Sequence, residues 1–104
     1  MADNEFDMTQ ESKDGQTKFF VKGRITSVNA NVLQHNINEV FDKGEINIIV
    51  NMMQVNFLSS AGIRVLLMFY KKAKNGGGSF HIEEPSENVV NVLGMTALDE
   101  MLLK

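Results

Sequence analysis

The sequence predicts an α/β fold: a mixed sheet of four to five strands that opens with an N-terminal hairpin and is packed by three to four helices. Two observations carry this prediction. Apolar residues alternate along the first part of the chain, as in a half-buried hairpin. Segments with helical spacing then alternate with short apolar runs, in the order β, β, α, β, α, β, α. Such alternation implies parallel strand pairs with right-handed crossovers. The chain has 104 residues, which is the length of one domain, so residues 1–104 are expected to form a single domain.

Composition excludes several functional classes. The chain has no Cys, which rules out disulfides, Cys-ligated zinc and thiol catalysis, and its two His leave little for a metal site. The net charge of -3 argues against a nucleic-acid partner. The longest apolar run, residues 65–70, is far shorter than the roughly 20 residues of a membrane helix. We therefore expect a cytoplasmic protein that binds no cofactor, metal, nucleic acid or membrane.

The hairpin is assigned from the first 21 residues. Residues 5–11 alternate as an acidic edge strand, with Phe6 and Met8 on one face. Asp14-Gly15 supplies the positive φ angles of a tight turn, and residues 17–21 form the return strand. The core of the domain is expected within residues 15–98.

The remaining elements follow from caps and periodicity. Ser27 is the expected N-cap of a first helix that ends at Gly44. Residues 46–50 form a buried strand, and residues 51–58 are expected to be a connection. A second helix runs from Ser60 to residue 74, a strand covers residues 79–82, and a third helix begins at Pro85-Ser86-Glu87 and stops at Gly94. The tail, residues 97–103, fits a strand or a short helix.

The second helix has apolar residues on two sides. Ile63, Leu66, Leu67, Tyr70 and Ala73 cluster on the side expected to face the sheet, and Phe69 is assigned to the core. Val65 and Met68 lie opposite, among Arg64, Lys71 and Lys72. Either neighbouring helices cover these two residues, or they form a partner-binding patch rimmed by the cations.

Ser60 lies at the start of this helix. Its hydroxyl could cap the free amides, and the same position suits a phosphate because the amides and the helix dipole favour an anion. On these grounds alone, Ser59 and Ser60 are well explained as ordinary caps.

A resemblance to a known family suggests a second role for the two serines. Residues 46–74, and above all the segment FLSSAGIRVL at residues 57–66, resemble the STAS domain of bacterial anti-sigma factor antagonists. Residues 21–25 resemble the family's glycine-containing segment before its first helix, and residues 85–94 its third helix. The resemblance covers about residues 15–98.

The resemblance implies a phosphorylation switch rather than an enzyme. The unphosphorylated protein would bind an anti-sigma factor that is a serine protein kinase, and so release the sigma factor. Phosphorylation of Ser60 would end binding, and a serine phosphatase would restore it. Ser59 replaces the family's usual Asp and is the second candidate, and Thr26 replaces an acidic residue. The expected partner-binding residues are Ser59, Ser60, Arg64, Val65, Met68 and Lys72. The protein is expected to be a monomer or weak dimer.

The same residues argue against other functions. A serine hydrolase is disfavoured because no G-x-S-x-G elbow is present, and Gly76-Gly77-Gly78 lacks the Lys-Ser or Lys-Thr of a phosphate loop. Two alternatives stay open. One is an unphosphorylated STAS scaffold subunit of a transporter or sensory complex, and the other is a small-ligand or nucleotide-binding α/β domain.

Overall fold

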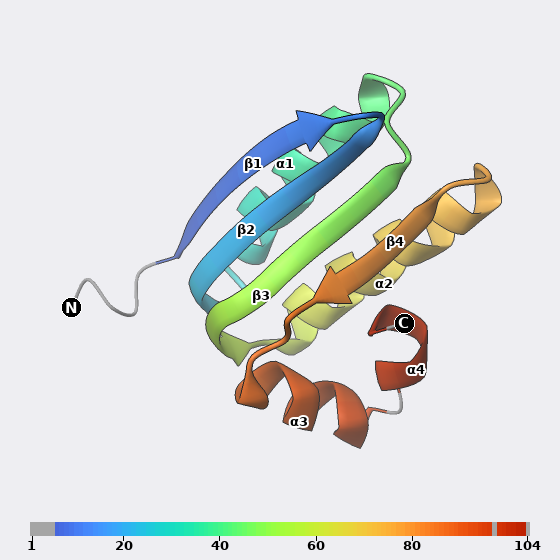
Figure 1. The fold of residues 1–104 in the computed structure, drawn as a ribbon. Coiled ribbons are helices and arrows are strands. Elements are labelled where there is room, and N and C mark those ends of the chain that lie inside the picture. The colour runs from blue at the N-terminus through green and yellow to red at the C-terminus, as the bar shows by residue number, and fades with distance from the viewer. Residues whose placement is uncertain (1–5, 97, 104) are drawn as a thin grey trace.

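The structure, a computed structural model, describes residues 6–96 and 98–103. Its elements are β1 (Asp7–Lys13), β2 (Gln16–Ile25), α1 (Ala30–Asp42), β3 (Asn47–Leu58), α2 (Ser60–Asn75), β4 (Ser79–Glu83), α3 (Glu87–Met95) and α4 (Asp99–Leu102). The strands form one four-stranded sheet in the order β1-β2-β3-β4. β1 is antiparallel to β2, whereas β2 pairs with β3 and β3 with β4 in parallel (Figure 1). The predicted α/β class and mixed sheet are confirmed.

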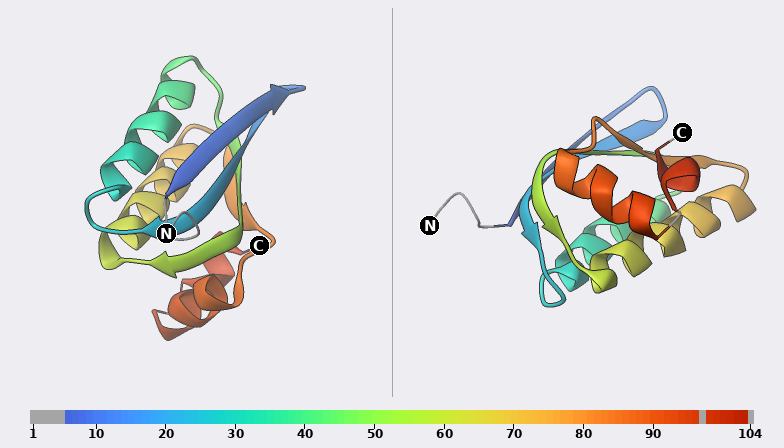
Figure 2. Two further views of the ribbon diagram at one scale, coloured as in Figure 1. Left: turned by 90° about the vertical axis from the view of Figure 1, so that its left-hand side faces the viewer. Right: turned by 90° about the horizontal axis from the view of Figure 1, so that it is seen from below.

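The helices lie largely on one side of the sheet. α1 and α2 cover one face, and the opposite face, turned toward the viewer in Figure 1, carries no helix. α3 packs against β3, and α4 against β4, α2 and α3 (Figure 2). Of the two alternatives for residues 97–103, the structure has the short helix, α4; residue 97 lies outside the described residues. Both helices that cover the sheet start near the ends of β2 and β3, which brings these connections together.

The N-terminal hairpin is confirmed, with a shifted boundary. Asp14 and Gly15 have φ angles of 57° and 78°, and Lys13 pairs with Gln16. β1 runs from Asp7 to Lys13 instead of over residues 5–11, and residue 5 lies outside the described residues. The strand extends to the turn because Asp14-Gly15 lets the pairing continue up to the last residue.

The predicted connection over residues 51–58 is wrong, because β3 continues to Leu58. The strand does not keep a period of two along its length. Its register against β2 shifts twice, and Met52, Val55 and Leu58 are buried at a spacing of three. Such irregularities put an extra residue into one strand and break the alternation by which a strand is recognised in a sequence.

Two predicted helix boundaries are also wrong. The N-cap of α1 is Asn29 and not Ser27, and its side chain does not cap the helix. Instead, the Thr26 amide donates to Asn29 Oδ1 at 2.7 Å and the Asn29 amide to Thr26 Oγ1 at 3.2 Å, which makes a tight turn before the helix. Gly94 does not stop α3, which runs to Met95. Leu93, just before Gly94, is completely buried.

Replacing Gly78 with Ala is expected to destabilise the protein by about 1–3 kcal/mol or more, as overpacking does. A Cβ atom at Gly78 would lie 2.0 Å from the carbonyl oxygen of Ile46, which is backbone and cannot turn aside. Gly94→Ala is the matched control, because a Cβ there meets nothing within 4 Å. Inside a helix this change should stabilise by about 0.5–1 kcal/mol. Urea unfolding measures the change in unfolding free energy of both variants. Equal changes for Gly78→Ala and Gly94→Ala would contradict the prediction.

Candidate functional site

The two serines lie where β2 and β3 end and α1 and α2 begin, at the lower end of the sheet in Figure 1. The Ser59 amide donates to the carbonyl of Ile25 at 2.9 Å, which ties the start of α2 to the end of β2. The carboxyl ends of parallel strands are where α/β proteins commonly place their binding sites.

Gly62 allows α2 to approach the strands closely. A Cβ atom on it would lie 2.8 Å from Ile25 Cγ2 and 2.8 Å from Leu58 Cδ1. Only a residue without a side chain leaves the first turn of α2 this close to the sheet. The glycine of the SSAG segment therefore sets where the two serines sit.

The two serines have different roles. Ser59 is the N-cap of α2, and its Oγ accepts a hydrogen bond from the Gly62 amide at 3.1 Å. The expectation that the Ser60 hydroxyl could cap the helix is therefore wrong. Ser60 is the first residue of the helix and is exposed. Within residues 6–96 and 98–103, its hydroxyl has no hydrogen-bond partner. Ser60 is thus the accessible hydroxyl of the pair.

A groove of about 310 Å³ lies between α1 and α2, and its lining includes Ala61, the residue that follows Ser60. Its lining comes from the start of α1 and one side of α2: Ser27, Ala30, Asn31, Gln34, Ala61, Arg64, Val65 and Met68. Three of the residues expected to bind a partner, Arg64, Val65 and Met68, therefore share one surface.

Val65 is buried, as the alternative of cover by a neighbouring helix predicts. Its side chain is only 8% exposed, because α1 packs against this side of α2, whereas Met68 keeps 39%. The two alternatives for this side of the helix are thus both partly realised. A neighbouring helix covers Val65, which lines the groove, and Met68 remains accessible to a partner.

Lys72 lies further along α2 and contacts α1. Its Nζ donates to Asn38 Oδ1 at 3.0 Å and lies 5.3 Å from the ring centroid of Phe41. These contacts hold the two helices together. By contrast, no described carboxylate pairs with Arg64, which leaves its guanidinium available.

Sequence reasoning missed a second cation at this end of the sheet. The Cζ atom of Arg24 lies 4.3 Å from the ring centroid of Phe57, in a cation–π contact between neighbouring strand ends. Both side chains are exposed. The contact depends on the shifted register of β2 and β3, so the sequence carries no direct signal for it.

Comparison with known proteins identifies the family. The family model for the STAS domain matches residues 7–104. The chain belongs to the STAS family. The match therefore covers nearly the whole chain and includes the serine segment.

Three similar proteins are named as anti-sigma factor antagonists. BtrV of Bordetella bronchiseptica, named as an anti-sigma factor antagonist, is 28% identical over 85 residues, covering 82% of this chain and 73% of BtrV. The anti-sigma-B factor antagonist of Bacillus subtilis is 25% identical over 96 residues, covering 92% and 85%. The crystal structure of an anti-sigma factor antagonist from Mycobacterium paratuberculosis has a TM-score of 0.77 at 25% identity, covering 95% and 84%.

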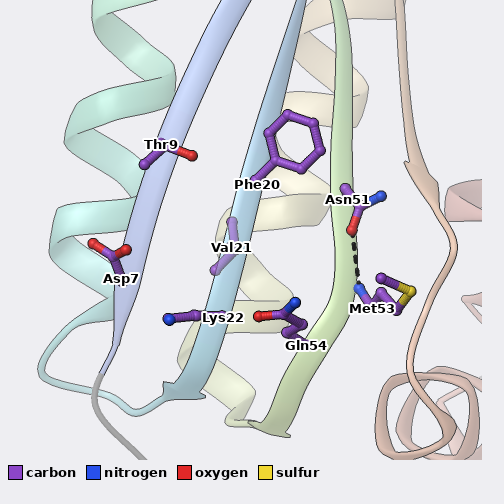
Figure 3. A pocket seen from close by; sticks show the side chains of 8 residues that line it. All are labelled: Asp7, Thr9, Phe20, Val21, Lys22, Asn51, Met53 and Gln54. Atoms are coloured by element: carbon purple, nitrogen blue, oxygen red, sulfur yellow. Dashed lines mark hydrogen bonds between the residues drawn. The ribbon is translucent and has the colours of Figure 1, made fainter. Parts of the chain in front are cut away.

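The open face of the STAS domain carries a second hollow of about 230 Å³, lined by residues of β1, β2 and β3 that include Thr9, Phe20, Lys22 and Met53 (Figure 3). This volume is below the roughly 300–1,000 Å³ of typical small-molecule sites. The hollow gives little support to the small-ligand alternative.

A polar network borders this hollow. The Asn51 amide donates to Glu83 Oε2 at 2.9 Å, and Lys18 Nζ lies 3.1 Å from the same oxygen. The hydrogen bond from Asn51 is the largest influence on the pKa of Glu83; burial opposes it and Lys18 adds to it, and the net effect lowers that pKa. The network fixes charges on the sheet face and lies away from Ser60.

Glu83→Gln is expected to lose stability at neutral pH and to lose little in acid. A carboxyl whose pKa is lowered by folding contributes stability above its unfolded pKa, and this contribution disappears as pH falls through the folded pKa. The difference from the wild type should therefore shrink between about pH 5 and pH 3. Urea unfolding at several pH values measures it. Glu39→Gln, on an exposed carboxylate, is the control, and the same pH profile for both variants would contradict the assignment.

Within residues 6–96 and 98–103, no group of three His, Cys, Asp or Glu could hold a metal ion. No helix there is long and apolar enough to cross a membrane. His35 lies 3.4 Å from Glu39 on the surface of α1.

Proposed function

We propose that this STAS domain is an anti-sigma factor antagonist whose binding is switched by phosphorylation of Ser60. The observation that carries the proposal is the exposed hydroxyl of Ser60, which has no hydrogen-bond partner among the described residues and precedes Ala61 of the groove between α1 and α2. The names of the similar proteins support the same function. We further propose that the whole chain acts as one domain, in the cytoplasm, as a binding protein without catalysis of its own.

In the unmodified state, the domain would bind an anti-sigma factor with serine kinase activity, which then releases its sigma factor. The binding surface would comprise Ser59, Ser60 and the groove residues Arg64, Val65 and Met68. Lys72 has a structural role in this proposal, because its contacts to α1 occupy it.

In the switching step, Ser60 Oγ attacks the γ-phosphorus of ATP bound to the kinase. The bond from phosphorus to the bridging oxygen breaks, ADP leaves, and a base of the kinase takes the hydroxyl proton. A serine phosphatase would reverse the step by hydrolysing the ester to serine and inorganic phosphate. We retain Ser59 as the second candidate, although its Oγ accepts the capping hydrogen bond.

The phosphate is expected to act at the interface and not on the fold. It adds about 1.5 to 2 negative charges at pH 7. At the N-terminus of a helix such charge is favourable by about 0.3–1 kcal/mol. The domain should therefore remain folded, and the loss of binding would come from bulk and repulsion.

Reconstitution tests the proposed function. Complexes of sigma factors with anti-sigma factors from the source organism are mixed with the purified protein, and free sigma factor is measured by size-exclusion chromatography. We expect one anti-sigma factor to bind the wild type and Ser60→Ala equally and to release its sigma factor. Binding to none of them, together with stable co-purification in a transporter or sensory complex, would favour the scaffold alternative.

A further inference from the structure

We propose that Arg64 reads the state of the switch, a proposal that rests on the proposed function. In the unmodified protein, the groove between α1 and α2 takes an apolar side chain of the anti-sigma factor, and Arg64 pairs with a carboxylate next to it. After phosphorylation, the phosphate on Ser60 pairs with Arg64 and withdraws this contact from the partner.

The shape of the groove selects an apolar side chain. Ala30 from α1 and Ala61 from α2 have small side chains, and Val65 closes the groove between the helices. Met68 is 39% exposed at the edge and can adapt to what lies against it. The groove therefore offers mostly aliphatic contact to its occupant.

The charge around the groove selects an acidic neighbour for that side chain. Arg64 is the one charged residue among those that line it, and the polar residues that α1 contributes, Asn31 and Gln34, are neutral. Lys71, also exposed, adds positive charge on α2. No carboxylate lines the groove in the described part of the chain, so a partner carboxylate meets attraction without a competing acid.

The same guanidinium is within reach of a phosphate on Ser60. Ser60 and Arg64 are four residues apart on α2 and therefore lie on one face. Side chains on a helix tilt toward its N-terminus, which directs Arg64 toward Ser60. Arginine pairs with phosphate through two parallel hydrogen bonds, a stronger contact than a single one.

Arg24 is the competing candidate and supplies the control. It lies at the same end of the sheet, but its guanidinium is stacked on Phe57 at 4.3 Å. We therefore expect Arg24 to respond less to a phosphate on Ser60 than Arg64 does.

The first experiment needs neither kinase nor partner. Phosphoserine is incorporated at position 60 during translation, and the phosphate is titrated by ³¹P NMR in the wild type, Arg64→Gln and Arg24→Gln. We expect Arg64→Gln to raise the second pKa of the phosphate by about 0.3, the size of a helix ion pair, and Arg24→Gln to raise it less. No change in Arg64→Gln, or a larger change in Arg24→Gln, would overturn the assignment.

The second experiment uses the anti-sigma factor that binds the wild type. Isothermal titration compares serine and phosphoserine at position 60, each in the wild-type background and in the Arg64→Gln background. In the unmodified protein, we expect Arg64→Gln to lower the affinity for the anti-sigma factor by about tenfold or more, as loss of a charged hydrogen bond does. Phosphate should weaken binding by about a hundredfold or more in the wild-type background. In the Arg64→Gln background it should weaken binding by only about tenfold, because the partner has no contact with Arg64 to lose.

Outcomes for the two proposals are distinct. If no anti-sigma factor binds the wild type, the proposed function fails. If one binds and the phosphate weakens both backgrounds equally, the proposed function stands and Arg64 is not the reader. Met68→Glu, which places a carboxylate at the edge of the groove, should weaken binding at least tenfold; unchanged binding would show that the partner does not use the groove.

Discussion

Ser60→Asp is expected to weaken binding of the anti-sigma factor by about a hundredfold and to leave the fold intact. A phosphate should weaken it by two to three orders of magnitude, the equivalent of about 3–4 kcal/mol. Ser60 is exposed at the first residue of α2, beside the groove, so an added charge meets the partner and not the core. Isothermal titration measures the affinity, and thermal unfolding verifies the fold.

Matched variants at the neighbouring serine separate binding from stability. Ser60→Ala should bind like the wild type. Ser59→Ala should lose about 1 kcal/mol of stability, because its Oγ caps α2 through the Gly62 amide. Ser60→Asp binding as tightly as Ser60→Ala would count against a charge-based switch at this position.

Phe69→Ala is expected to cost about 3–5 kcal/mol of unfolding free energy. Phe69 is completely buried and stacks on Phe41 of α1, with ring centroids 5.4 Å apart. Lys72 lies over both rings. The substitution removes the aromatic contact that joins the two helices flanking the groove, in a small domain of marginal stability.

Urea unfolding measures this loss, and Phe69→Leu provides the comparison. Leu restores much of the apolar volume without the stacked ring, so its cost should be clearly smaller. A loss below about 1 kcal/mol for Phe69→Ala would contradict the view that this pair holds α1 and α2 together. An intermediate loss of anti-sigma factor binding in a still-folded Phe69→Leu would indicate that the groove depends on the pair.

Local signals predicted most of the fold. Asp14-Gly15 marked the hairpin, because few residues accept its positive φ angles. The helical spacing of Leu66 and Ala73 predicts a buried face of α2, and both residues, like Phe69, are buried in the structure. Features set within one element by backbone chemistry or periodicity are thus readable from the sequence.

Features that depend on two elements were not predicted. The sequence predicts this strand only to residue 50, because the shifts in register of β3 against β2 hide the strand period. The sequence leaves open whether Val65 is covered, because only the packing of α1 shows which side of α2 is covered. The contact of Arg24 with Phe57 follows from strand register for the same reason.

The sequence predicts the start of α2 to within one residue. The segment FLSSAG located the start of α2, but either serine could have been the cap. A shift of one residue in the helix start exchanges their roles, and helix starts are not fixed that closely by sequence. The structure assigns the cap to Ser59 and leaves Ser60 exposed.

The most direct measurement locates the phosphate. The protein is incubated with ATP and each anti-sigma kinase of its source organism, and the modified residue is mapped by mass spectrometry in the wild type, Ser60→Ala and Ser59→Ala. We predict phosphate on Ser60, absent from Ser60→Ala and retained in Ser59→Ala. Phosphate on Ser59 would contradict the assignment of the site, and no phosphate with any kinase would contradict the phosphorylation switch.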